Sequence, residues 1–214
     1  MPAKLYAVLI ADIVASSAQL RLRNRLAATL TMASRLHLHR KFIRLPYSVT
    51  AGDEFQTVCA DLSALPQLIL DLRVLLQPLS LRIGIGVGRI ADHIEPPVNR
   101  LGGEAFQRAR TAIDAIKSSN PFKFDTLTYF VSPDASLDET LNLIYGLNDT
   151  LLSGVTRKQW DTIAAFTRNP ALAHTSRQLH RDASTISRNL KRGYYWQLSE
   201  TVRTTGPLLS RAFG

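Results

Sequence analysis

Hydrophobic and polar positions along the first 135 residues follow two periods, one typical of strands and one typical of helices. Short apolar runs predict strands at "KLYAVLIAD", at 47–51 and 55–60 as a hairpin, at "LSLRIGIGVGRI" and at "TLTYFV". Longer segments with apolar residues at helical spacing separate them, at 16–40, after Pro66 and in "GGEAFQRARTAIDAIKSS". The order β-α-β-β-α-β-α-β predicts an α+β sandwich with an antiparallel hairpin at its centre.

The segment that follows predicts one more helix and then a change of character. In "SLDETLNLIYGLNDTLL", Ser136 and Glu139 have the spacing of a capping box at a helix start. We therefore expect three parts: a sheet domain at 1–135, a linking helix at 136–153 and a small all-α domain at 154–214.

The last part has the pattern of a helix-turn-helix. Thr156 and Gln159 form a second capping-box spacing at the start of "TRKQWDTIAAF". Two short helical stretches follow, "ALAHTSRQLH" and "STISRNLKRGYY", joined by the tight turn "RDA". Helices of this length, joined by a short polar turn, are typical of helix-turn-helix units.

Charge is concentrated in the same part of the chain. Residues 151–214 hold 10 Lys/Arg against 3 Asp/Glu, whereas residues 1–150 hold 16 against 14. This excess predicts double-stranded DNA as a partner, and a homodimer because one such module has a limited contact area. The alternative is a helical hairpin that only dimerises or covers the sheet domain. The candidate DNA-binding residues of the second helix are Ser184, Thr185, Ser187 and Arg188 for base edges, with Lys191 and Arg192 for phosphates.

Other features of composition restrict the compartment and the type of site. No apolar run reaches 18 residues, so no membrane-spanning helix is expected and a membrane is not a predicted partner. A single cysteine, Cys59, excludes an internal disulfide and, with no signal-peptide pattern, predicts a cytoplasmic protein.

Two carboxylates stand at the ends of predicted strands. Asp12 ends the first strand, and Asp53 lies at the tip of the hairpin in "TAGDEF". If these strands are neighbours, both carboxylates reach one edge of the sheet, where two carboxylates and a nucleotide's phosphates would suit Mg²⁺. The segment "IVASS" leads into a helix whose free N–H groups suit phosphate oxygens. The alternative is a pair of water-exposed acids.

One predicted strand, "LRIGIGVGRI", has features with structural explanations. Gly84, Gly86 and Gly88 project to one face, which allows either close helix packing or close approach of a ligand. Arg82, inside the strand, is suited to pairing with a nearby acid.

Four segments in order resemble class III nucleotidyl cyclases: "YAVLIADIVASSAQL", "TAGDEF", "LRIGIGVGRI" and "GGEAFQRAR". The hairpin is also similar to that of GGDEF diguanylate cyclases. Together with the helix-turn-helix, the chain resembles the SatD family over almost its whole length. This resemblance implies a ferredoxin-like, cyclase-type palm with a second, small all-α helix-turn-helix domain.

The resemblance also implies roles for individual residues. The metal ligands for Mg²⁺ (or Mn²⁺) would be Asp12, the Ile13 carbonyl, Asp53 and Glu54. Arg110 would be catalytic, offsetting charge on the α-phosphate. The nucleotide contacts would be Ser16, Ser17, Arg25 and Gly52.

Two positions depart from the cyclase pattern. Phe106 stands where cyclases have asparagine, and Val49 where they have the base-selecting lysine. The sequence therefore favours a DNA-binding regulator whose palm binds a nucleotide and Mg²⁺. The alternatives are an active nucleotidyl cyclase or nucleotidyltransferase with a two-metal mechanism, and an interaction protein with a decayed site.

Overall fold

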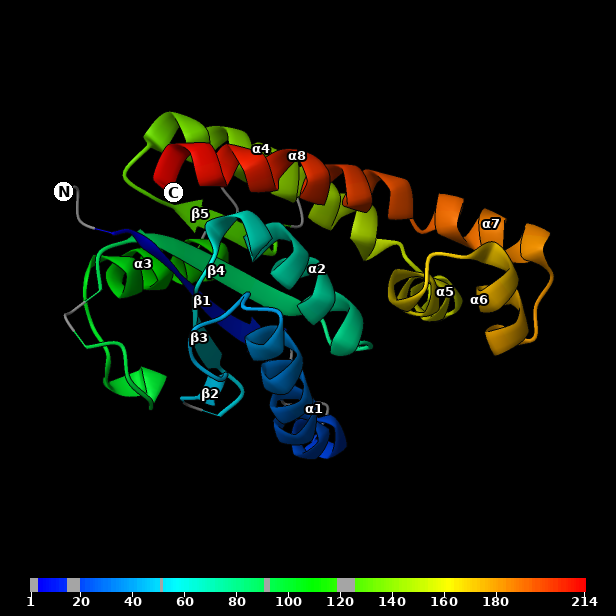
Figure 1. Cartoon of the computed structure of the whole chain (residues 1–214), viewed down its shortest axis with the longest axis horizontal. Helices are drawn as coiled ribbons and strands as arrows, with labels where there is room; N and C mark the ends of the chain where they lie inside the picture. Colours follow the sequence, from blue (N-terminus) through cyan, green and yellow to red (C-terminus); the bar gives the residue numbers. More distant parts are fainter. Residues whose placement is uncertain (1–3, 15–19, 51, 91–92, 119–125) are drawn as a thin grey trace.

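A computed structural model describes residues 4–14, 20–50, 52–90, 93–118 and 126–214 of the chain, with the backbone alone described for 20–25 (Figure 1). It is a mixed α+β structure with one five-stranded sheet in the order β2-β3-β1-β4-β5. All neighbouring strands are antiparallel except β4 and β5, which are parallel. The strands are β1 (Tyr6–Ile13), β2 (Ser48–Val49), β3 (Phe55–Cys59), β4 (Leu81–Gly88) and β5 (Thr128–Val131).

Eight α-helices accompany the sheet in the described residues, and the predicted order of elements is confirmed. The hairpin β2–β3 lies at one edge of the sheet, however, and β1 lies at its centre, so the expectation of a central hairpin was wrong. The reason is that β1 is apolar on both faces and becomes buried between two strands. The helices are α1 (Leu20–His39), α2 (Leu65–Leu75), α3 (Glu104–Ser118), α4 (Ala135–Ser153), α5 (Arg157–Arg168), α6 (Leu172–Leu179), α7 (Ala183–Arg192) and α8 (Tyr195–Phe213).

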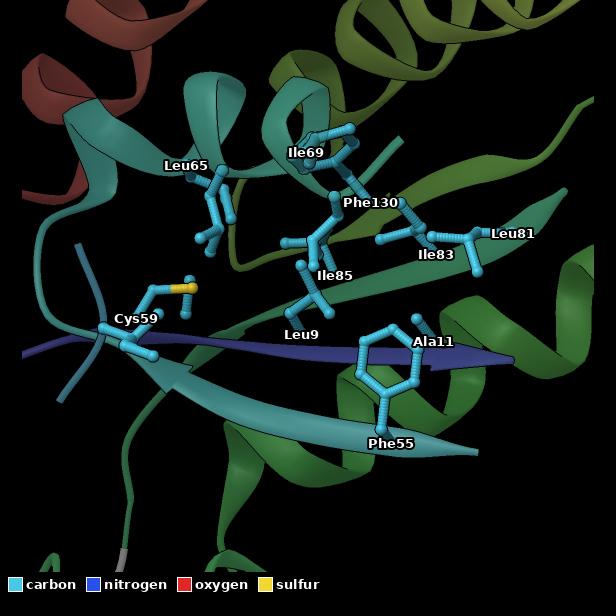
Figure 2. Packing of buried hydrophobic residues seen from close by; sticks show 14 of the residues in the cluster. Leu9, Ala11, Phe55, Cys59, Leu65, Ile69, Leu81, Ile83, Ile85 and Phe130 are labelled. Atoms are coloured by element: carbon cyan, nitrogen blue, oxygen red, sulfur yellow. The ribbon is translucent and has the colours of Figure 1, made fainter. Parts of the chain in front are cut away.

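The main apolar core lies on the face of the sheet covered by α1, α2, α4 and α8. Odd-numbered residues of β1, β3 and β4, together with Phe130 of β5, point into it, because side chains alternate between the two faces of a strand. Figure 2 shows Leu9, Ile83 and Ile85 of the sheet beneath Leu65 and Ile69 of α2. The even-numbered residues of β1 and β4 therefore face α3.

Helix α3 packs directly on the backbone of β4 through two glycines. A Cβ atom added at Gly86 would lie 2.1 Å from the Ala109 nitrogen, and one at Gly84 would lie 2.6 Å from the Ile113 nitrogen. Any side chain there would overlap the helix backbone. Of the two interpretations of these glycines, close helix packing is therefore confirmed.

Helices α4 and α8 lie side by side and extend from the sheet toward α5, α6 and α7 (Figure 1). Helix α4 begins at Ala135, and Asp134 caps it by accepting a hydrogen bond from the Leu137 N–H at 3.0 Å. The proposed capping box at Ser136 was thus wrong, because the helix starts before that residue. No helix in the described part of the chain is long and apolar enough to cross a lipid bilayer.

Helices α5, α6 and α7 pack around a second, smaller apolar cluster. The capping box at Thr156 and Gln159 is confirmed, with both of its hydrogen bonds present. The turn between α6 and α7 includes His180 with a left-handed backbone (φ 50°). The buried residues of the cluster are Trp160, Ile163, Phe166, Ile186 and Leu190.

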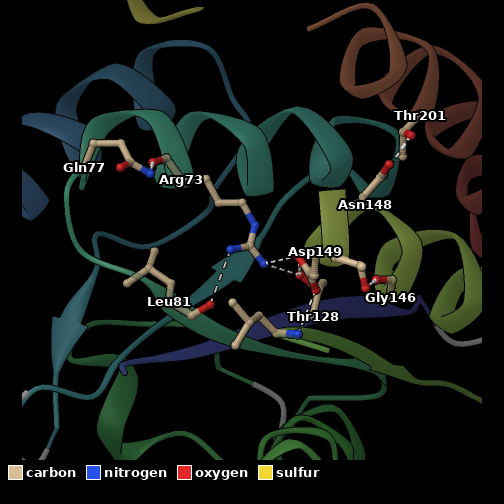
Figure 3. A network of polar contacts seen from close by, with 10 residues as sticks. Arg73, Gln77, Leu81, Thr128, Gly146, Asn148, Asp149 and Thr201 are labelled. Carbon is tan, nitrogen blue, oxygen red and sulfur yellow. Dashed lines mark hydrogen bonds and ion pairs between the residues drawn. The ribbon is translucent and has the colours of Figure 1, made fainter. Parts of the chain in front are cut away.

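A buried ion pair connects the sheet to α4 (Figure 3). Arg73 of α2 donates to the Asp149 carboxylate of α4 at 2.6 Å and to the Thr128 hydroxyl of β5 at 2.7 Å. The Leu127 N–H donates to the other Asp149 oxygen at 2.8 Å. Burial raises the pKa of Asp149, and the Arg73 guanidinium acts against that rise.

Candidate functional site

Asp12 lies near the end of β1 and faces α3. Its side chain is 8% exposed, and two cations contact it. The Lys117 ammonium from the last turn of α3 lies 2.6 Å from Asp12 Oδ2. Arg82, which is opposite Asp12 in the β1–β4 register, lies 3.5 Å from Oδ1. The expectation that Arg82 pairs with a nearby acid is confirmed, and the Asp12 carboxylate is charge-compensated.

Glu54 occupies the neighbouring position at the start of β3. Both of its carboxylate oxygens accept hydrogen bonds from Arg110 of α3, each at 2.7 Å, and Thr50 donates to Oε1 at 3.0 Å. The Arg110 hydrogen bonds hold the pKa of Glu54 below its ordinary value, and Glu54 in turn raises the pKa of Arg110. Lys117 lies 4.0 Å from Glu54 Oε2, so a single ammonium contacts both acids.

The other predicted metal ligands are Asp53, one residue before Glu54, and the Ile13 carbonyl, one residue after Asp12. Because β1 and β3 are adjacent antiparallel strands, with Ala11 paired to Phe55, the end of β1 meets the hairpin turn. Asp53 lies half-buried in that turn, next to Gly52, whose φ of 64° is a conformation that glycine adopts without strain. The Ile13 side chain enters the apolar core on the opposite face, which leaves its backbone carbonyl as the candidate ligand.

The remaining predicted nucleotide contacts are not located by the structure. Ser16 and Ser17 lie outside the described residues, and Arg25 belongs to the part of α1 whose side chains are not described.

The donor atoms at this site suit a hard divalent cation that binds together with phosphates. In the residues that the structure describes, no three His, Cys, Asp or Glu side chains converge to hold a metal by themselves. Mg²⁺ is commonly held by one or two carboxylates, with substrate phosphates and waters as its other ligands. Asp12 and Glu54, with Asp53 next to Glu54 in the hairpin turn, supply that number of carboxylates. The residues present therefore fit such an ion.

Sequence reasoning missed Lys117 as a member of the site. It follows Arg110 by seven residues, or two helical turns, and so lies on the same face of α3. That spacing was the available signal. The strand that Lys117 would reach could not be known without the order of strands in the sheet.

The second candidate surface is the outer face of α7. Ile186 and Leu190 on the inner face are fully buried in the three-helix cluster, while the polar face points outward. Arg188 lies along the helix, with its side chain donating to the Ser184 carbonyl and the Thr185 hydroxyl, each at 3.3 Å. All of the predicted DNA-binding residues except the half-buried Thr185 are exposed: Ser184, Ser187, Arg188, Lys191 and Arg192.

Three comparisons relate the chain to known proteins. No curated protein matches it. Among solved structures, it is similar to the crystal structure of a regulator of polyketide synthase expression from Bifidobacterium adolescentis, with 15% identity, 97% of this chain and 86% of that chain covered, and a TM-score of 0.29. A superposition this loose supports no inference about function. The model of the SatD family matches residues 6–191, which include all five strands and the candidate residues of both surfaces except Arg192, and the chain therefore belongs to the SatD family.

Proposed function

We propose that this chain is a DNA-binding regulator whose sheet domain binds a nucleotide together with Mg²⁺ or Mn²⁺. The observation that carries the proposal is the outer face of α7. It combines short hydroxyl side chains near the helix start with Arg188, Lys191 and Arg192 farther along, while its inner face is anchored by buried apolar residues. A helix presented in this way suits the major groove, with base edges near its N-terminus and phosphates farther along.

The architecture around α7 supports the same proposal. The sharp turn at His180 separates α6 from α7, and α5 packs against both. This arrangement supports a helix-turn-helix domain, and the part of the chain that contains it carries most of the net charge of +9. Because one such module has a small contact area, the proposed functional unit is a homodimer with two α7 helices on DNA.

The nucleotide part of the proposal rests on the site formed by Asp12, Ile13, Asp53, Glu54, Arg110 and Lys117, called the strand-end site. The order β4-β1-β3-β2, with α1 and α2 on one face, corresponds to a ferredoxin-like split βαβ arrangement, which supports a cyclase-type palm. In this proposal Asp12, Glu54, Asp53 and the Ile13 carbonyl would hold the cation, which would supply positive charge to offset that of the nucleotide's phosphates. Arg110 and Lys117, which contact Glu54 and Asp12, would be available to the phosphates of a nucleotide held there.

DNA binding is tested by fluorescence anisotropy with the full-length chain and labelled duplexes at several salt concentrations. Arg188→Ala should weaken binding to some sequences more than to others, by about 1–3 kcal/mol at the preferred one, since contacts with base edges discriminate. Lys191→Ala should weaken all sequences alike and reduce the slope of log K against log salt by about 0.9.

The matched control is Arg211→Ala at the end of α8, which removes the same charge at the opposite end of the molecule (Figure 1). It should leave DNA affinity unchanged. If the wild-type protein fails to bind duplex DNA at low salt, the regulator proposal is wrong.

Catalysis is a second candidate function, favoured by the position of Arg110 beside Glu54. The site would then act as a nucleotidyl cyclase or nucleotidyltransferase, with Arg110 offsetting charge on the α-phosphate. Release of pyrophosphate from one of the four nucleoside triphosphates with Mg²⁺ or Mn²⁺, abolished in Arg110→Ala, would support it. If none of the four triphosphates releases pyrophosphate, the site binds a nucleotide without catalysing its conversion.

A further inference from the structure

Two of the three acids of the strand-end site, Asp12 and Glu54, are already paired with cations of the protein. Asp12 contacts Lys117 at 2.6 Å and Arg82 at 3.5 Å, while Glu54 is held by both nitrogens of the Arg110 guanidinium. The three cations outnumber the two acids they contact. A divalent cation that approaches these two carboxylates therefore meets acids whose charge is already neutralised by side chains of the protein.

Lys117 and a metal ion compete for the same oxygen atom. An ammonium 2.6 Å from Asp12 Oδ2 occupies the position that a metal ligated by that oxygen would need. The two also repel each other, because like charges a few ångströms apart interact strongly even at a high effective dielectric constant. Lys117 must therefore move away from Oδ2 before that oxygen can ligate a metal.

The side chains have unequal freedom to move. The Asp12 carboxylate is 8% exposed and is short and fixed to the central strand, whereas the side chains of Lys117 and Arg110 are 38% and 46% exposed and are long. The cations can therefore leave while the acids stay in place. A polyphosphate beside the metal would give the displaced cations new partners of the same sign as the carboxylates they left.

We infer that Lys117 is a built-in counter-cation of this site, which excludes a divalent metal from Asp12 until a polyphosphate is present and then contacts that polyphosphate. This inference rests on the proposed nucleotide site and adds its regulation. It makes binding of metal and of phosphate mutually dependent, since the phosphate draws away the group that blocks the metal. Free divalent cation alone then occupies the site poorly.

The experiment compares wild type, Lys117→Gln and Lys117→Arg in the full-length chain, with MnCl₂ alone and with sodium tripolyphosphate alone as probes. Electron paramagnetic resonance measures free Mn²⁺, and calorimetry with a chelator present measures tripolyphosphate. Lys117→Gln should bind Mn²⁺ about tenfold more tightly than wild type, because one adjacent positive charge is gone. The same variant should bind tripolyphosphate more weakly, and Lys117→Arg should resemble wild type in both.

Lys158→Gln is the control, since it removes one charge from an exposed position on α5, away from the site. It should change neither affinity, and thermal unfolding by circular dichroism confirms that each variant is folded. An Mn²⁺ affinity in Lys117→Gln that is equal to or weaker than that of wild type, or undetectable in both, overturns the counter-cation role. If Mn²⁺ binding tightens as expected but tripolyphosphate binds to no variant, the phosphate site of the proposed function fails, and of the counter-cation role only the exclusion of free metal by Lys117 stands.

Discussion

Single glycines in β4 set the distance between the sheet and α3, and so the position of the cations that α3 carries. Gly86 and Gly84 allow the backbone of α3 to touch the strand, which brings Lys117 and Arg110 within reach of acids on β1 and β3. A helix held farther away by even one methyl group would lose these contacts. The packing role of the glycines thus also serves the site.

Gly86→Ala should destabilise the protein by about 3 kcal/mol or more, because an added Cβ 2.1 Å from the Ala109 nitrogen forces the helix to move. Urea unfolding followed by circular dichroism measures this change. Gly154→Ala is the control: its backbone φ is −92°, and nothing lies within 4 Å of the added atom. That variant should be neutral or slightly more stable, and equal stability of the two variants would contradict the account of the glycines.

Among the secondary-structure elements, the buried ion pair determines how α4 is attached to the sheet. Arg73 of α2 and Asp149 of α4 also contact β5, so three elements meet at one pair of charges. A second contact lies on the other side of α4, where Asn148 donates to the Thr201 hydroxyl of α8 at 2.8 Å. These bonds orient the two long helices that lead to α5, α6 and α7.

Arg73→Met should lower the free energy of unfolding by about 3–5 kcal/mol, because it leaves the Asp149 carboxylate buried without its partner. The double variant Arg73→Met/Asp149→Leu should recover most of this loss, since no charge then remains buried. Chemical denaturation of both variants is the measurement, and Arg168→Met, at an exposed position, should change stability by less than about 0.5 kcal/mol. A double variant less stable than Arg73→Met would show that the pair is not the source of the effect.

In the whole molecule, the two candidate surfaces lie at different places along one continuous framework (Figure 1). Helix α4 leaves the sheet toward the three-helix unit, and α8 returns along it until Leu209 enters the main core. Val74, near the end of α2, packs against the apolar cluster of the three-helix unit. A change in packing at the sheet therefore has a path through packed helices to α7.

Ligand at the strand-end site should change DNA affinity by a coupling free energy of about 1–3 kcal/mol. The measurement is a DNA titration with and without saturating nucleotide and Mg²⁺, in wild type and in Asp12→Asn, which should lose the response. Coupling is reciprocal, so DNA must change nucleotide affinity by the same factor. Equal DNA affinities under every condition would show that the two surfaces function independently.

Much of the fold could be predicted because the spacing of apolar residues along the chain differs between strands and helices, and so indicates local structure directly. The order of strands and helices, and the capping box at Thr156, depend on residues within a few positions of one another. The edge position of the hairpin depends on which strands pair across long stretches of chain, and no local pattern records that choice. The start of α4 was misplaced for a smaller reason, since Asp134 and Ser136 are both suitable caps.

The sequence by itself determined the types of residue available for chemistry: strand-end acids, an arginine on the following helix, and a basic helix-turn-helix pattern with a polar outer face. Only the tertiary structure decided which of them meet. Alternation along β1 and β4 directs Asp12 and Arg82 to the face of α3, and the glycines bring Lys117 to the same carboxylate. Charges that lie between 56 and 105 residues apart in the chain become partners because strand order, set by burial of apolar surface over the whole molecule, places them side by side.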